Sequence, residues 1–145
     1  MNTDNNLIKN YMKLLPAFVY ENSTLFNVLE TMKKLQVGFV SIIKEDFSII
    51  GYIDKKKVRE IIKNDFFNDV DLLKNTKIKD ISTKFNFPIV LYPRMTIMDG
   101  YSTMKYIGVK CLPVVDLPWE KKIIGFLWLD DIIPVVEKNC VKIPA

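Results

Sequence analysis

Short apolar segments alternate with amphipathic ones along this chain, and the order is the same in both halves. Apolar residues spaced three or four apart indicate a helix, whereas short β-branched runs indicate strands. In the first half these segments are 17–20, 25–35, 39–43 and 49–53, and in the second half the expected strands are 89–92, 112–115 and 123–127. A further helix is expected to open near Asp54 in the first half and near Asp130 in the second. The pattern therefore predicts strand, helix, strand, strand, helix, twice.

Ordered identities between the halves indicate a duplicated unit. Thr31-Met32-Lys33 recurs 72 residues later as Thr103-Met104-Lys105. Ile49-Ile50-Gly51 recurs 74 residues later as Ile123-Ile124-Gly125, so the second copy has two extra residues between these points. Chance would scatter such identities instead of keeping them in order, so the sequence predicts two repeats of one structural unit.

The repeats divide the chain into five segments. We expect an N-terminal helix or arm at 1–15, repeats at 16–63 and 87–137, a polar connector at 64–86 and a tail at 138–145. The N-terminal helix is expected from Leu7 to Leu15, ending before Pro16. Thr24 and Thr96 are the expected helix caps of the two repeats. The fold class is α/β of the α+β type, with small sheets flanked by helices.

Composition removes several kinds of chemistry. The chain has no histidine and only two cysteines, Cys111 and Cys140. Without histidine, the chain cannot form a serine–histidine or cysteine–histidine nucleophile. Two cysteines alone cannot complete a structural zinc site. No Gly-rich phosphate loop is present. We therefore expect a protein that is not an enzyme, with two free thiols.

Charge and hydropathy bear on location and partners. The net charge is +4, but Arg59 and Arg94 are the only arginines, so there is no strong nucleic-acid signal. The run Lys55-Lys56-Lys57 is the one basic cluster. No apolar run is long enough for a membrane helix, and the polar N-terminus does not look like a signal peptide. We expect a cytoplasmic protein.

Two stretches of the second repeat resemble the CBS domain family in its tandem arrangement, the Bateman module. They are Gly108–Asp116 and Gly125–Ile132, and the likeness covers about residues 16–137. The resemblance implies two β-α-β-β-α repeats packed with pseudo-twofold symmetry, each with a small three-stranded sheet. It also implies two clefts between the repeats, where many members bind AMP, ADP or ATP. Some members bind S-adenosylmethionine, and others bind nothing known.

The family's cleft has a hydroxyl residue followed three positions later by an Asp that binds ribose. In the second repeat Trp128 replaces the hydroxyl residue and Asp131 keeps the acid. In the first repeat Asp54 stands at the hydroxyl position and Lys57 replaces the acid. The resemblance implies a second cleft lined by Pro16, Ala17, Phe18, Lys110, Cys111, Leu112, Pro113, Trp128 and Asp131, with Lys110 as the phosphate partner.

Each implied role has a structural alternative. Trp128 could cap the core, because large aromatic residues usually bury surface. Asp131 could be an ordinary acid in the first turn of a helix, and Lys57 a solvated lysine.

The leading functional hypothesis is a regulatory module that senses an adenine nucleotide (AMP, ADP or ATP), with no cofactor required. The alternative is a ligand-free structural or dimerisation module. Such a module would be attached to a membrane transporter, such as one of the voltage-gated chloride channel family, or to an enzyme such as a sugar-phosphate isomerase. Family resemblance also implies a homodimer.

Overall fold

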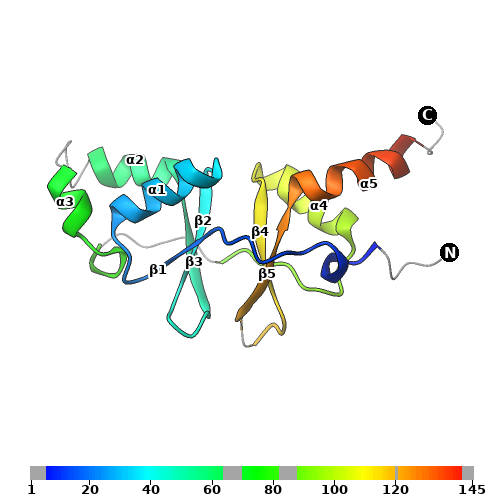
Figure 1. The fold of residues 1–145 in the computed structure, drawn as a ribbon, viewed down its shortest axis with the longest axis horizontal. Coiled ribbons are helices and arrows are strands. Elements are labelled where there is room, and N and C mark those ends of the chain that lie inside the picture. Colours follow the sequence, from blue (N-terminus) through cyan, green and yellow to red (C-terminus); the bar gives the residue numbers. More distant parts are fainter. Residues whose placement is uncertain (1–5, 64–69, 82–87, 120, 142–145) are drawn as a thin grey trace. The chain divides into compact units, whose positions relative to one another are not determined.

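The chain folds into two compact units, each built mainly on one repeat (Figure 1). The computed structural model describes residues 6–63, 70–81, 88–119 and 121–141. Residues 139–141 are described by their backbone only. The first-repeat unit is Ala17–Ile89, and the second-repeat unit combines Met1–Pro16 with Val90–Ala145. The N-terminal segment therefore belongs to the unit of the later repeat.

The first-repeat unit has a three-stranded sheet in the order β1-β2-β3. Its strands are β1 (Phe18–Tyr20), β2 (Phe39–Ile43) and β3 (Ile49–Asp54), with β1 parallel and β3 antiparallel to β2. Every residue of β2 is buried, as expected for a central β-branched strand. Helices α1 (Leu25–Leu35), α2 (Lys55–Ile61) and α3 (Val70–Asn75) complete the unit.

Helix α1 begins at the predicted cap. The Thr24 hydroxyl accepts a hydrogen bond from the Asn27 amide at 3.2 Å, and the Asn27 side chain accepts one from the Thr24 amide at 3.0 Å. This reciprocal pair satisfies backbone donors that the first helical turn leaves free. Leu25, Val28 and Met32 are buried on one face, which confirms the predicted apolar stripe.

The second-repeat unit has the same order of elements with a smaller sheet. Its elements are α4 (Ile97–Ile107), β4 (Cys111–Val115), β5 (Ile123–Trp128) and α5 (Leu129–Val141). The expected strand at 89–92 is reduced to one parallel bridge between Leu91 and Val114. In the first repeat the Ser41 amide donates to the Ala17 carbonyl, but the matching position is Pro113, which has no N–H to donate. The proline thus shortens the ladder.

The expected N-terminal helix over Leu7–Leu15 is wrong. The segment holds only a 3-10 turn, Ile8–Asn10, and then runs extended. The amide of Lys13 donates to the Phe126 carbonyl at 2.9 Å, and the Phe126 amide donates to the Lys13 carbonyl at 2.8 Å. Pairing with the exposed edge of β5 therefore outweighs local helix propensity. We call residues 7–16 the N-terminal arm.

The connector contains more structure than its polar composition predicts. A 3-10 turn, Ile78–Asp80, sits where the amide of Ile78 donates to the Ser23 carbonyl at 2.8 Å. It matches the turn in the N-terminal arm, where the amide of Ile8 donates to the Met95 carbonyl at 2.8 Å. Ile8 and Ile78 are each fully buried. Thus a segment that precedes one repeat packs against the other repeat, in both units.

We predict that Ile8→Ala lowers the free energy of unfolding by about 2–5 kcal/mol, because it opens a cavity under α4. Urea unfolding measures the change. Lys9→Ala is the matched control, since Lys9 is exposed on the same turn and such changes stay within about 0.5 kcal/mol. Equal stabilities of the two variants would show that the arm is not part of the core.

Candidate functional site

The candidate site lies in the second-repeat unit, where β5 ends and α5 begins. Trp128 is the last residue of β5, and Asp131 lies in the first turn of α5. Cys111, the first residue of β4, is the register partner of Trp128. The N-terminal arm runs beside this corner through the Lys13–Phe126 pairing. The corner thereby brings together an aromatic, an acidic, a thiol and a basic side chain: Trp128, Asp131, Cys111 and Lys13.

Asp131 is paired with a residue that the sequence did not indicate. The Nζ atom of Lys13 lies 3.0 Å from Oδ2 of Asp131, and the two side chains are 45% and 36% exposed. An ion pair this exposed contributes about 0–1 kcal/mol, because solvent and salt screen it. The carboxylate is therefore held in place but can be reached by a competing ligand.

Trp128 is fixed by the same arm. Its indole Nε1 donates to the carbonyl of Leu15 at 3.2 Å, and Nζ of Lys13 lies 5.8 Å from the ring centroid. The indole N–H is thus satisfied and the ring faces a cation. These contacts hold Trp128 against the N-terminal arm of its own unit, and its role in a ligand site stays a prediction.

The other predicted lining residues in β4 and just before it differ in exposure. Leu112 and Pro113 are buried, so their side chains belong to the core of the unit. Lys110 is exposed, and its carbonyl accepts the amide of Leu129 at 2.8 Å, which ties the start of β4 to the start of α5. Only Lys110 of these three offers a charged group to a ligand.

Burial controls the chemistry of Cys111. The side chain is 3% exposed, and burial raises the pKa of its thiol well above the usual value. Lys13 lowers this pKa and Asp131 raises it, both to a smaller extent. The sulfur therefore stays a protonated thiol and acts as a small apolar group, because the thiolate is the nucleophilic form.

The remaining predicted residues stand where the chain passes between the units. Pro16 is exposed at the end of the N-terminal arm, while Ala17 and Phe18 belong to the first-repeat unit. Ala17 is buried, and Phe18 contacts Tyr20 and Phe47 edge to face at 5.4 and 6.0 Å between ring centroids. Their role in a ligand site stays a prediction.

The matching corner of the first repeat has no free acid. Asp54 caps α2 by accepting the amide of Lys57 at 2.8 Å. The Lys57 Nζ atom lies 3.6 Å from Oε2 of Glu60. Both residues thus have structural partners, and the expectation that only the second corner keeps a ribose acceptor stays a prediction.

Lys13 and Leu15 are the two site residues that sequence reasoning missed. A signal existed, because Ile8-Lys9 recurs as Ile78-Lys79 and Pro16 recurs as Pro88. This repetition indicates that the N-terminal arm is the start of a repeat and not a separate helix. In the described part of the chain, no three metal-ligating side chains gather, and no helix is long and apolar enough to span a membrane.

With this geometry in hand, the chain can be compared with known proteins. Residues 8–64 match the sequence profile of the CBS domain. The first repeat is therefore similar to a CBS domain. Among curated relatives, it is 23% identical over 129 residues to an uncharacterised 33.4 kDa protein encoded in a ribosomal RNA operon of Thermofilum pendens. The alignment covers 89% of this chain but 39% of that protein, so the chain spans less than half of this relative.

Solved structures show that the whole chain has the fold of a CBS domain pair. CBSX2, an Arabidopsis thaliana protein solved in complex with AMP, has a TM-score of 0.66 at 16% identity, covering 92% of this chain and 98% of that one. The CBS domain pair of protein MJ0100, solved with 5′-methylthioadenosine and S-adenosyl-L-methionine, has a TM-score of 0.63 at 16% identity, covering 92% and 97%. The predicted fold class and family resemblance are confirmed.

We predict that iodoacetamide modifies Cys111 at least about 100-fold more slowly in the folded chain than in urea at about pH 8.5. The folded thiol has the raised pKa and stays protonated there, whereas the unfolded thiol is partly ionised. Mass spectrometry of the peptides separates Cys111 from Cys140. Equal rates at Cys111 in both conditions would contradict its burial.

Proposed function

We propose that this chain is a regulatory module that binds an adenosine-containing ligand at the Asp131 corner of the second-repeat unit. The observation that carries the proposal is the position of Asp131 in the first turn of α5, with Oδ2 engaged by Lys13. Oδ1 of Asp131 has no hydrogen-bond partner within the described residues. A carboxylate oxygen of this kind accepts hydrogen bonds from ribose hydroxyls.

The other groups at the corner fit the rest of such a ligand. Lys110 is exposed beside the start of α5 and supplies a positive charge for a phosphate or carboxylate. The Trp128 ring supplies an apolar surface. AMP in CBSX2 and S-adenosyl-L-methionine in the MJ0100 pair are ligands of this class in proteins of the same fold.

Ligand binding at this corner acts on the N-terminal arm. A ligand that takes the Asp131 carboxylate competes with Lys13, and the arm is then held by its backbone pairing with β5 and by Trp128. Ligand binding thereby changes how the N-terminal arm, residues 7–16, is held. Regulation requires such a contact that differs between the ligand-bound and ligand-free states. The module needs no turnover to work in this way.

The second candidate is a ligand-free structural module, and a specific observation favours it. Three polar side chains of the two corners already have a partner within the chain: Asp54 caps α2, Trp128 donates to Leu15, and Asp131 pairs with Lys13. Tyr106 and Trp119 are 94% and 76% exposed in the second-repeat unit. Such side chains suit contact with a second copy or with a parent protein, either a transporter or an enzyme.

We predict that AMP, ADP, ATP or S-adenosylmethionine raises the melting temperature of the wild-type chain. A ligand at about 100 times its Kd stabilises by about 2.7 kcal/mol. Asp131→Asn removes the acceptor charge and weakens the affinity by about 10–100-fold. Asp130→Asn is the matched control on the same turn and keeps the affinity. If no ligand shifts the melting temperature, the structural candidate stands instead.

We also predict that Lys13→Gln strengthens binding of the same ligand by up to about fivefold, because the ligand no longer competes with an ion pair of about 0–1 kcal/mol. Isothermal titration calorimetry measures the change, with Lys9→Gln as the control on the same arm. A weaker affinity in Lys13→Gln would mean that Lys13 contacts the ligand directly and is not its competitor.

A further inference from the structure

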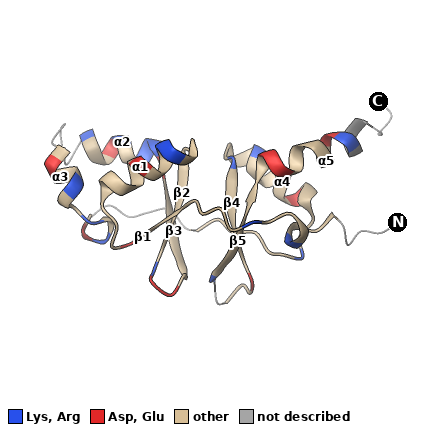
Figure 2. Cartoon of the chain, in the orientation of Figure 1, with Lys and Arg blue, Asp and Glu red and all other residues tan. Residues whose placement is uncertain are grey.

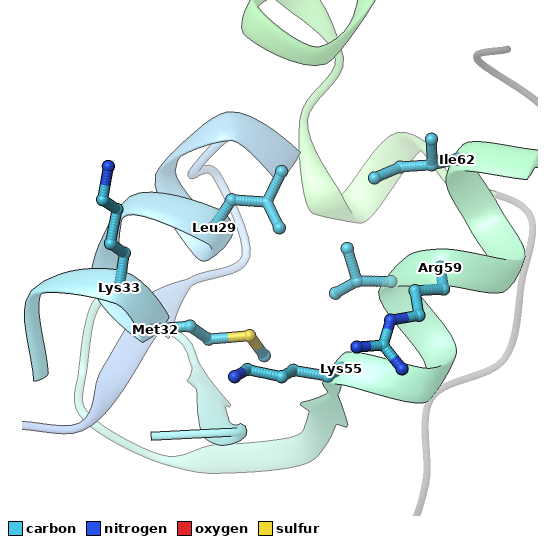
Figure 3. Close-up of a pocket in the computed structure, with 7 residues that line it drawn as sticks. Leu29, Met32, Lys33, Lys55, Arg59 and Ile62 are labelled. Atoms are coloured by element: carbon cyan, nitrogen blue, oxygen red, sulfur yellow. The ribbon is translucent and has the colours of Figure 1, made fainter. Parts of the chain in front are cut away.

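A separate groove of about 340 Å³ lies between α1 and α2 of the first-repeat unit (Figure 3). Its apolar floor consists of Leu29, Met32, Val58 and Ile62. Lys55 and Arg59 extend from α2 toward α1, and Lys33 rises from the rim on α1. Among the residues that the structure describes, no Asp or Glu lines it. Small-molecule sites are typically lined by apolar side chains with a few polar or charged groups, and this groove has that composition.

The second repeat has apolar residues at the positions that correspond to the lining residues of α2. Lys55 and Arg59 correspond to Leu129 and Ile133, and Ile62 corresponds to Val136. There α4 packs directly against α5, whereas α1 packs against α3 and the groove separates it from α2. Since both units share one architecture, the fold does not require cations here. Where the second repeat has a contact between two helices, the first repeat has the groove between α1 and α2.

Asp54 caps α2 and Glu60 pairs with Lys57, but other positive charges of the helix are left without a partner among the described residues. Lys55 and Arg59 are four residues apart on one helix face, and such like charges repel. Lys55–Lys57 occupy the first turn, where the helix dipole favours acids, as Asp130 and Asp131 do in α5. Within the described residues, Lys33, Lys55 and Arg59 form no salt bridge. In Figure 2 the blue of Lys and Arg marks parts of both α1 and α2.

The size of the groove selects the kind of ligand. Helix α2 has seven residues and is about 10 Å long, too short to hold several turns of a partner helix. A volume of about 340 Å³ is at the lower end of small-molecule sites. A compact amphiphile matches both the floor and the cations, with its apolar body on Leu29 and Ile62 and its anionic group between Lys55 and Arg59.

We propose that the groove between α1 and α2 binds a small anionic amphiphile, a carboxylate or phosphate carried on a short hydrocarbon or aromatic body. This site is distinct from the Asp131 corner, because all its lining residues belong to the first-repeat unit. It does not depend on whether an adenosine ligand binds. The affinity comes from burying apolar surface on the floor and from charge-assisted contacts to Lys55 and Arg59.

Isothermal titration calorimetry with decanoate tests the proposal on the full chain. We expect saturable binding of one decanoate per chain, and an affinity at least about tenfold lower in Lys55→Gln/Arg59→Gln, since hydrogen bonds to charged groups are the stronger ones. The matched control is Lys56→Gln/Lys63→Gln, which removes two exposed charges near the groove without touching its lining. It should keep the affinity. Decanol, which has no charge, should bind at least about tenfold more weakly than decanoate.

Several results would overturn the proposal. Equal losses in the two double variants would reduce it to non-specific attraction by a basic surface. Absence of saturable binding to decanoate, with binding to phosphatidylglycerol vesicles instead, would make the groove part of a membrane-facing surface. Sedimentation that shows a dimer lost in Lys55→Gln/Arg59→Gln would mean that a second copy fills the groove. All four substitutions are at exposed positions, so circular dichroism should show folded variants.

Discussion

The pairing of the N-terminal arm with β5 is the interaction on which the second-repeat unit depends. Two backbone hydrogen bonds join Lys13 to Phe126, and Ile8 is buried beside Met95. Without the arm, β5 would be an exposed edge and the core under α4 would lose a fully buried side chain. The same logic holds in the first-repeat unit, where Ile78 fills the matching place. In the first-repeat unit this segment follows in the same contiguous stretch, Ala17–Ile89, whereas the second-repeat unit takes it from the other end of the chain.

The arm also decides the chemistry of the Asp131 corner. Because β pairing fixes the backbone of Lys13, its side chain reaches both the Asp131 carboxylate and the face of Trp128. Leu15, two residues later, accepts the indole N–H. A structural requirement, covering the edge of β5, thus places a cation at the one corner that keeps the family's acid. Core formation and the proposed ligand recognition are therefore linked at this site.

The two repeats have diverged most where their helices meet. In the second-repeat unit, apolar residues of α5 pack on α4, and acids occupy the first turn of α5. In the first-repeat unit, Asp54 caps α2, while lysines follow it and α1 leans on α3. The acid corner thus stands in one copy and the basic groove in the other. Both copies keep the antiparallel strand pair, β2 with β3 and β4 with β5.

The sequence by itself determined the repeat, the order of its elements and the helix caps. These features depend on local spacing and capping chemistry, as at Thr24 and Thr96. It also placed Asp131 in the first turn of the helix that follows β5. Only the tertiary structure decided the extended course of residues 7–16 and the Lys13–Asp131 pair, because strand pairing across more than a hundred residues leaves no local pattern. The loss of the strand at 89–92 was likewise set by Pro113 on the neighbouring strand.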